Sequence, residues 1–240
     1  MAFPRLPSAG ELLGKASVLA AFGATATVKA LAIKSQLGSW EQGQNIEKYV
    51  ELAAQIESLL FLVLLLNLTL LRFRPKQTAA GWEPRLSALI GTCLSFLLVA
   101  SPPADVGPVF RIIAITLVLV GGLLSIYVLA WLGRSFSITA QARQLVTSGP
   151  YAVVRHPLYV CEEIALIGVV ILYLSPLAIL IAAVQWMFQL RRMTNEERVL
   201  RASFPEYSDY ATITPKIVPR QFAKWEKQDR NLLLERLRSQ

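Results

Sequence analysis

Long apolar runs separated by short polar segments set the pattern of this chain. A helix needs about 20 residues to cross roughly 30 Å of hydrocarbon. The pattern therefore predicts an all-α, polytopic membrane protein with about six spans: Ala16–Gln36, Leu52–Arg72, Leu86–Ser101, Val109–Leu132, Leu158–Tyr173 and Leu177–Leu190. The last two form a hairpin that turns at Ser175-Pro176, because proline cannot continue the incoming helix. The first run carries Lys29 and Lys34, so an interfacial helix remains an alternative for residues 16–36.

Basic residues gather in alternate loops. They are Arg72, Arg74, Lys76 and Arg85 after the second run, Arg134, Arg143 and Arg155 after the fourth, and Arg191 and Arg192 after the sixth. The intervening loops carry Glu41, Glu47, Lys48 and Glu51, and then Asp105. The positive-inside rule predicts that the basic loops face the cytoplasm. We therefore expect an integral protein of a bacterial inner membrane with both termini cytoplasmic.

Composition supports lipid as the main surrounding. The 240 residues are 54% hydrophobic and only 17% charged, whereas an ordinary soluble domain carries about 25% charged residues. The net charge of +8 suits anionic headgroups. We expect no nucleic-acid partner, because no basic stripe is interleaved with aromatic residues. The two cysteines lack the spacing of a metal site, so no metal is expected. The pattern does not indicate an oligomeric state.

The last apolar run differs from the others, because its helical pattern continues through Arg191–Phe204. A short hairpin with a polar helical extension predicts a cleft near the inner face of the membrane. We accordingly divide the chain into N-terminal transmembrane helices (residues 1–132, about four spans), a catalytic core (133–220) and a polar tail (221–240).

One motif lies just before the hairpin. Gly149-Pro150-Tyr151 is followed by Arg155-His156-Pro157-Leu158-Tyr159. Glycine and proline together predict a rigid turn, and the backbone N–H groups that open the next helix lack partners within it. Such groups can bind a carboxylate. His156 is the only histidine. A lone histidine beside a proline is more often a structural residue at a helix end, but its pKa near physiological pH also allows it to act as a donor or acceptor.

Charged and aromatic residues follow the hairpin. Arg192 and Glu196 are four apart and share a helix face, which is compatible with a solvated ion pair or with a site at the hydrocarbon edge. Tyr207 and Tyr210 are three apart, so they suit either the membrane interface or the two sides of an adenine or ribose.

Two adjacent acids, Glu162 and Glu163, lie one turn inside the fifth run. Such acids are costly in lipid unless they are paired, hydrated or protonated. One of them is expected to point into the cleft toward Arg155 or Arg192, or else to form an ion pair between helices. We interpret Lys29 and Glu57 as a structural pair between the first two runs.

The ordered set G-P-Y, R-H-P-x-Y, a helical hairpin, R-x-x-x-E-E, F-x-E-Y-x-x-Y and V-P-R, from Gly149 to Arg220, resembles the isoprenylcysteine carboxyl methyltransferase family. The resemblance implies a membrane enzyme that uses S-adenosyl-L-methionine and has no soluble dinucleotide-type domain. By this resemblance Arg192 and Glu196 border the reacting centre. Glu162 and Glu163 depart from the better-known eukaryotic members, and we expect these two acids to face the substrate. The cofactor-binding residues would be Tyr151, Arg155, His156, Pro157, Leu158, Tyr159, Glu197, Tyr207 and Tyr210.

Methyl transfer to a carboxylate needs no base, because the acceptor is already ionised at neutral pH. Arg192 is then a natural clamp for the carboxylate, whereas an amine or phenol acceptor would need Glu196 or Glu162 as a base. The resemblance implies an acceptor that enters from the bilayer, and a prenylcysteine-like carboxylate, an isoprenoid acid and another lipid are all compatible with it. Two other functions remain open, an NADPH-dependent enzyme similar to sterol reductases and a non-catalytic membrane scaffold.

Overall fold

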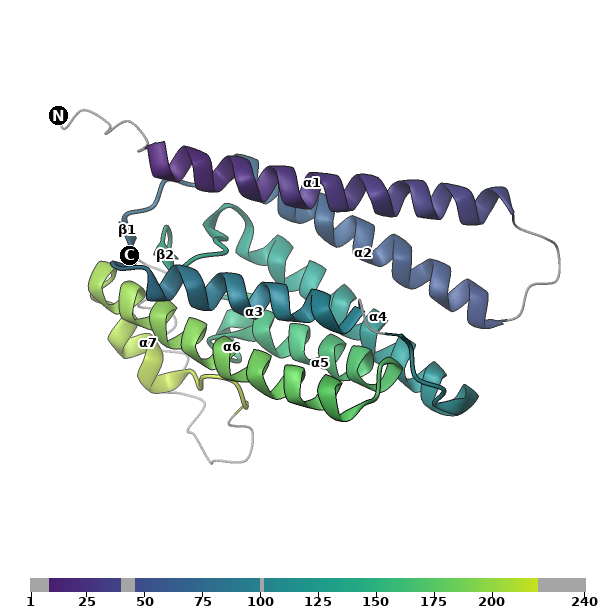
Figure 1. The fold of residues 1–240 in the computed structure, drawn as a ribbon. Helices are drawn as coiled ribbons and strands as arrows, with labels where there is room; N and C mark the ends of the chain where they lie inside the picture. The colour runs from purple at the N-terminus through teal and green to yellow at the C-terminus, as the bar shows by residue number, and fades with distance from the viewer. Residues whose placement is uncertain (1–8, 40–45, 100–101, 220–240) are drawn as a thin grey trace. The chain divides into compact units, whose positions relative to one another are not determined.

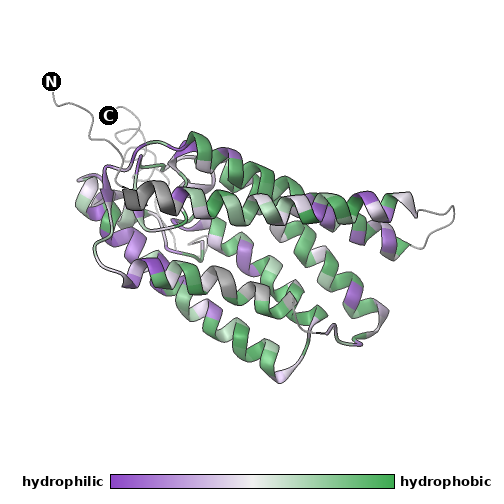
Figure 2. Ribbon diagram, turned by 45° about the horizontal axis from the view of Figure 1, so that its top comes forward, coloured by the Kyte–Doolittle hydropathy of each residue, from purple (hydrophilic) through white to green (hydrophobic). Residues whose placement is uncertain are grey.

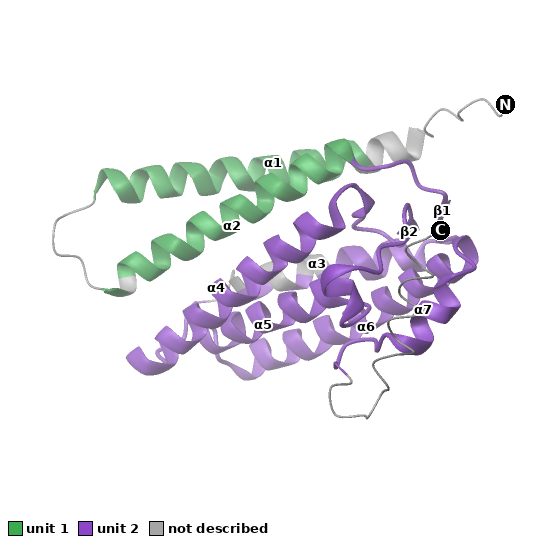
Figure 3. Ribbon diagram, turned by 180° about the vertical axis from the view of Figure 1, so that it is seen from behind, with its two compact units in different colours: residues 1–71 green, residues 72–240 purple. Residues whose placement is uncertain are grey.

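The computed structural model describes residues 9–39, 46–99 and 102–219, and these are mostly helical, as predicted (Figure 1). The described helices are α1 (Ala9–Gly38), α2 (Ile46–Leu71), α3 (Glu83–Val99), α4 (Gly107–Leu132), α5 (Pro157–Leu172), α6 (Pro176–Ser203) and α7 (Tyr207–Ile213). Short 3-10 turns, η1 (Gly133–Ser135) and η2 (Gly149–Ala152), and strands β1 (Gln77–Thr78) and β2 (Gln141–Ala142) connect them. The chain divides into two compact units, residues 1–71 and 72–240 (Figure 3).

Three of the described helices are long and apolar enough to cross a membrane, at Lys15–Gly38, Lys48–Leu71 and Gly107–Ser135. The first of these covers the run whose spanning character was open. The third, fifth and sixth predicted runs also form helices, but α3 has 17 residues and α5 has 16. The count of six spans and the division at residue 132 therefore stay predictions. The polar tail at 221–240, together with Arg5, Glu41, Ser101 and Arg220, lies outside the described residues.

Unit 1 is a pair of helices, α1 and α2, that pack side by side (Figure 3). The Lys15 ammonium donates to the Leu70 carbonyl at 3.0 Å near the ends of the two helices. Glu57 is 6% exposed and interacts with the charge of Lys29. The two predicted partners thus lie close enough for their charges to interact, but no direct ion pair between them is found among the described residues.

In unit 2, α4 packs on α5 and α3 packs on α6 (Figure 1). Two glycines let the backbones of α4 and α5 approach each other closely. A Cβ on Gly121 would lie 2.8 Å from the Cys161 carbonyl oxygen, and one on Gly168 would lie 3.0 Å from the Val118 backbone nitrogen. Small residues at such positions let two helix backbones approach each other. Because α4 is a candidate span, this contact fixes α5 against a membrane helix.

The α5–α6 hairpin turns where the sequence predicts. The Ser175 side chain accepts a hydrogen bond from the Ala178 backbone N–H at 3.1 Å and caps α6, which is the usual role of serine at a helix start. Leu98 of α3, Leu166 of α5 and Ala178 of α6 form a buried apolar cluster at this end of the hairpin. From there α6 runs without a break to Ser203, beyond its apolar part.

A small antiparallel ladder joins two basic loops at the opposite end of unit 2. Gln77 pairs with Ala142 and Thr78 with Gln141, and the Phe73 N–H donates to the Arg134 carbonyl at 2.9 Å. The sequence pattern did not predict these strands. Figure 2 shows many hydrophilic residues of unit 2 around the strands and the end of α6, and further hydrophilic residues at the opposite ends of the helices. The ladder, α7 and the extension of α6 form a polar layer at the end of unit 2 where the strands lie.

Candidate functional site

The turn before α5, η2 (Gly149–Ala152), needs glycine at its first residue. Gly149 opens η2 with a φ of +60°, and a Cβ at this position would run into the Trp131 indole. The Arg155 and His156 N–H groups donate to the carbonyls of Pro215 and Lys216 at 2.8 and 3.1 Å. The segment after α7 is thereby held against the start of α5.

Glu197 is the centre of a buried ionic cluster. Its carboxylate contacts His156 Nε2 at 3.0 Å, Arg155 Nη1 at 3.3 Å and Arg201 Nη2 at 3.2 Å. Burial alone would raise the pKa of Glu197, but the hydrogen bond from His156 and the charge of Arg155 hold this pKa below its usual value. Glu197 is therefore a fixed anion that binds the turn before α5 to α6.

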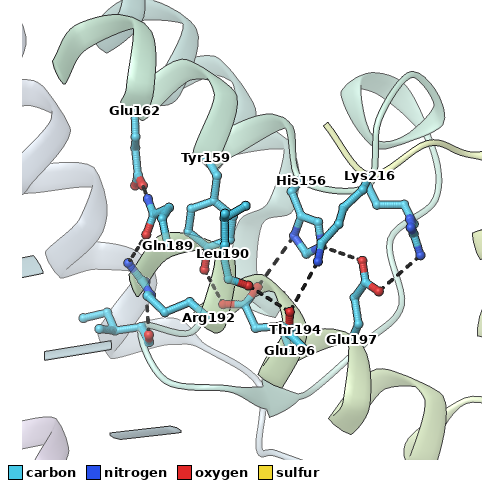
Figure 4. A network of polar contacts seen from close by, with 12 residues as sticks. His156, Tyr159, Glu162, Gln189, Leu190, Arg192, Thr194, Glu196, Glu197 and Lys216 are labelled. Atoms are coloured by element: carbon cyan, nitrogen blue, oxygen red, sulfur yellow. Dashed lines mark hydrogen bonds and ion pairs between the residues drawn. The ribbon is translucent and has the colours of Figure 1, made fainter. Parts of the chain in front are cut away.

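His156 lies between two carboxylates. Its Nε2 faces Glu197, and its Nδ1 lies 4.0 Å from Glu196 Oε2. Glu196 also accepts a hydrogen bond from the Tyr159 hydroxyl. Figure 4 shows these side chains converging from α5 and α6. The structure thus brings the two motifs that flank the hairpin into one cluster.

Arg192 does not pair with Glu196, although the two share a helix face. Instead its Nη1 donates to Gln189 Oε1 at 3.0 Å and its Nη2 to the Ile138 carbonyl at 3.3 Å. The guanidinium also lies over the Tyr159 ring, 5.1 Å from its centroid. Its buried Nε has no hydrogen-bond partner, and no ion pair to Arg192 is found among residues 102–219 or the other described ranges. The solvated ion pair, which was one of the two alternatives for Arg192 and Glu196, is therefore not formed, and neutral oxygens hold this cation in place.

The two acids of α5 face α6. The Glu162 carboxylate accepts a hydrogen bond from Gln189 Nε2 at 2.7 Å, and Gln189 Oε1 accepts one from Arg192 Nη1 (Figure 4). Glu163 lies near Gln185 instead, and a buried oxygen of each side chain, Oε1, has no hydrogen-bond partner. The prediction that one acid points toward Arg192 holds through this glutamine bridge. Our sequence reasoning missed Gln185 and Gln189, although two glutamines in an apolar run were a visible signal.

A narrow hollow lies on the α3 side of Arg192 and Glu196, and it is too tight to hold a water molecule. Its lining residues are Pro84, Ala88, Ile138, Ala140, Arg192, Asn195 and Glu196. Asn195 ties α6 to α3 there, because its Nδ2 donates to Glu83 Oε2 at 3.1 Å and to Ser87 Oγ at 3.4 Å. Sequence reasoning missed Asn195, which is an ordinary polar residue in a polar stretch.

The predicted nucleoside contacts, Tyr207 and Tyr210, are 1% and 2% exposed and belong to an apolar core with Val199 and Phe204. The Tyr210 hydroxyl donates to the Tyr151 carbonyl at 2.6 Å. Burial raises the pKa of both phenols. Tyr210 thus supports the turn before α5, whereas the buried Tyr207 hydroxyl has no hydrogen-bond partner. A contact of either ring with a nucleoside stays a prediction.

The donor set at the start of α5 fits the amino-acid end of S-adenosylmethionine. No side chain caps this helix, and Pro157 occupies its first turn, so the Leu158 and Tyr159 N–H groups point out of the helix end. The buried Arg155 Nε has no hydrogen-bond partner, and the Glu196 carboxylate, which forms no ion pair with an arginine among the described residues, can accept from an ammonium group. No cluster of metal-ligating residues is found in the described part of the chain.

Part of the chain is similar to a known family of methyltransferases. Residues 113–202 match the sequence model of the isoprenylcysteine carboxyl methyltransferase (ICMT) family. Protein-S-isoprenylcysteine O-methyltransferase B of Arabidopsis thaliana is 33% identical over 112 residues, which are 44% of this chain and 57% of that protein.

Two bacterial proteins are also similar. They are the nickel-cobalt-cadmium resistance protein NccN of Alcaligenes xylosoxydans xylosoxydans (37% identical, 33% of this chain and 38% of that protein) and the cobalt-zinc-cadmium resistance protein CzcN of Cupriavidus metallidurans (41% identical, 32% and 36%). The matched segments thus span between about a third and three fifths of these relatives.

Proposed function

We propose, from the premise that this chain belongs through residues 113–202 to the isoprenylcysteine carboxyl methyltransferase family, that it is a membrane methyltransferase that uses S-adenosylmethionine. Its acceptor is a lipophilic carboxylate that arrives from the bilayer. The membrane helices and the polar cluster at one end of unit 2 support a reaction at a membrane surface. We assign that surface to the cytoplasmic side of a bacterial inner membrane, because the basic loops lie at this end.

The start of α5 is the proposed seat of the cofactor. Arg155 and the uncapped N–H groups of Leu158 and Tyr159 would hold its carboxylate, and His156 and Glu197 keep this turn in place. When bound, S-adenosylmethionine supplies a methyl group on a positively charged sulfur, which keeps the electron pair of the broken carbon–sulfur bond while a carboxylate oxygen gains the methyl. No proton has to move, so the chain needs only to bind, orient and exclude water.

The observation that best supports this proposal is that Arg192 has no carboxylate partner in direct contact among the described residues. Its charge is held by the neutral oxygens of Gln189 and Ile138, and it lines a hollow next to the cofactor's proposed seat. A buried cation is costly unless it is paired. Guanidinium groups bind carboxylates in a bidentate fork. An acceptor carboxylate would supply the missing anion and would be oriented by it.

The test compares alanine substitutions at two neighbouring arginines, Arg192 and Arg191. Arg192→Ala is expected to lower kcat/KM by at least about 100-fold, since two hydrogen bonds to a charged group are worth about 3 kcal/mol. Stabilisation by S-adenosylhomocysteine, read as a rise in Tm, should survive. Arg191→Ala is the control, because Arg191 is 64% exposed and pairs with Glu83. Equal loss of turnover and of cofactor binding in Arg192→Ala would assign Arg192 to the cofactor instead.

The same melting assay separates the other two functions. Stabilisation by NADPH and not by S-adenosylhomocysteine would support a reductase, and stabilisation by neither would support a scaffold. The family match and the plant relative do not favour a reductase.

A further inference from the structure

Three polar side chains form a chain of hydrogen bonds that leads from α5 to α6. Gln189 donates through Nε2 to the Glu162 carboxylate at 2.7 Å and accepts through Oε1 from Arg192 Nη1 at 3.0 Å (Figure 4). Gln189 is 1% exposed, so solvent does not compete for its two ends. The charges of Glu162 and Arg192 also interact across the amide. An anion and a cation are thus held apart by one neutral side chain.

The two charged ends fix the orientation of the Gln189 amide. An ionised carboxylate only accepts hydrogen bonds, and a guanidinium only donates them. The opposite orientation of the amide would place its oxygen against the Glu162 carboxylate and its NH2 group against Arg192, and both contacts would be repulsive. An amide that joins a carboxylate to a guanidinium therefore has one stable orientation, with its oxygen on the guanidinium.

Arg192 keeps donors for a further acceptor. A guanidinium has five N–H groups in a planar fork. In Arg192 one of them is used by Gln189 and one by the Ile138 carbonyl, and Nε has no hydrogen-bond partner among the described residues. A carboxylate in the place of the amide would neutralise this cation, and an incoming carboxylate would then meet an ion pair instead of a positive charge.

We propose that Gln189 is a neutral spacer, which keeps the Glu162 carboxylate one side chain away from Arg192 so that the guanidinium stays available to the carboxylate of the acceptor. This inference rests on the proposed function and adds two positioning residues to it, Glu162 and Gln189. Glu162 offsets part of the cost of burying the cation while the site is empty, because opposite charges attract each other over several ångströms where water is excluded. It does so without occupying the fork, as a direct ion pair would.

The test exchanges the acid and the amide. In the double variant Glu162→Gln/Gln189→Glu, the exchange variant, an amide at position 162 donates to a carboxylate at position 189, which accepts from Arg192. The hydrogen-bond chain and the net charge are both kept, and only the order of the two groups differs. Acceptor binding is followed in two ways with purified full-length protein in lipid nanodiscs: by KM for methylation of N-acetyl-S-farnesylcysteine, a lipophilic carboxylate, and by the rise in Tm that this acceptor causes.

The two variants should change KM in opposite directions. The exchange variant is expected to raise KM by about 10-fold or more, because a hydrogen bond to the charged guanidinium is lost to the new ion pair. Its Tm without ligand should not fall, and its stabilisation by S-adenosylhomocysteine should persist. Glu162→Gln alone is expected to lower KM by about threefold, because Arg192 then lacks its distant counter-charge and attracts the acceptor more strongly. The same loss should lower its Tm without ligand. Residues that only support the fold would not produce these opposite signs.

Each outcome decides the inference. A wild-type KM in the exchange variant would overturn it, and so would a KM in Glu162→Gln that does not fall. Should the exchange variant fail to fold, the direction of the KM change in Glu162→Gln decides alone. Stabilisation of wild type by S-adenosylhomocysteine, with neither methylation of the acceptor nor a Tm rise caused by it, would overturn the inference and leave a methyltransferase standing. Absence of both stabilisation and methylation would remove the proposed function itself.

Discussion

Glu197 carries the ionic cluster, so Glu197→Gln is the most informative change in stability. The side chains of Glu197 and Arg155 are 7% and 12% exposed, and removing one partner of a buried pair costs about 3–5 kcal/mol. Arg201 is 51% exposed, so its share is under about 1 kcal/mol. Because glutamine keeps an acceptor for His156, we expect a loss of about 3 kcal/mol, which corresponds to roughly 6–12 °C in Tm.

The effect should depend on pH in one direction. The pKa of Glu197 lies below its ordinary value because of His156 and Arg155, so its contribution is complete above the ordinary glutamate pKa of about 4.3. That contribution is lost as the pH falls through the lowered native pKa. Melting of wild type and Glu197→Gln in nanodiscs should therefore show a gap at pH 7 that narrows below about pH 4. Asp209→Asn, which changes an exposed acid in α7, is the control, and its Tm should stay close to that of wild type at every pH. A gap that is constant with pH, or that widens in acid, would refute the reasoning.

Two glycine substitutions test the packing around the site. Gly149→Ala should lower stability by about 2 kcal/mol or more, because its methyl meets Trp131 at a positive φ. Gly81→Ala, also at positive φ but in open space, should cost less, and an equal Tm loss would remove the role of the indole. Gly121→Ala should cost about 1–3 kcal/mol by separating α4 from α5, and an unchanged Tm would show that the two helices are free to part.

Hydrophobic pattern predicted the helices well, because a long apolar run has few other structures in lipid. The hairpin turn was readable from Ser175 and Pro176 for the same local reason. Strands of two residues each, such as Gln77–Thr78, leave no periodic signal, so their pairing could not be predicted. The hydrophobic pattern alone also cannot give the number of membrane spans, because a helix as short as α5, with 16 residues, lies below the usual spanning length of about 20.

The site was predictable as a set of residues and not as a set of contacts. The spacing correctly placed Arg192 and Glu196 on one helix face. However, the Glu196 carboxylate is hydrogen-bonded to Tyr159, and the Arg192 guanidinium is hydrogen-bonded to Gln189. These partners come from α5 and from elsewhere on α6, and sequence spacing says nothing about competition between them. The Ile138 carbonyl is a backbone group, which no residue type can signal.

The most direct measurement is methyl transfer itself. Purified protein in nanodiscs made with total bacterial lipid is incubated with S-adenosylmethionine labelled in its methyl group, and the label in the organic extract is followed with and without base treatment. We predict label in an extractable product that base releases, as expected of a methyl ester, and its loss in Arg192→Ala. Label that resists base would contradict a carboxylate acceptor, and no label above the Arg192→Ala background would contradict methyl transfer at this site.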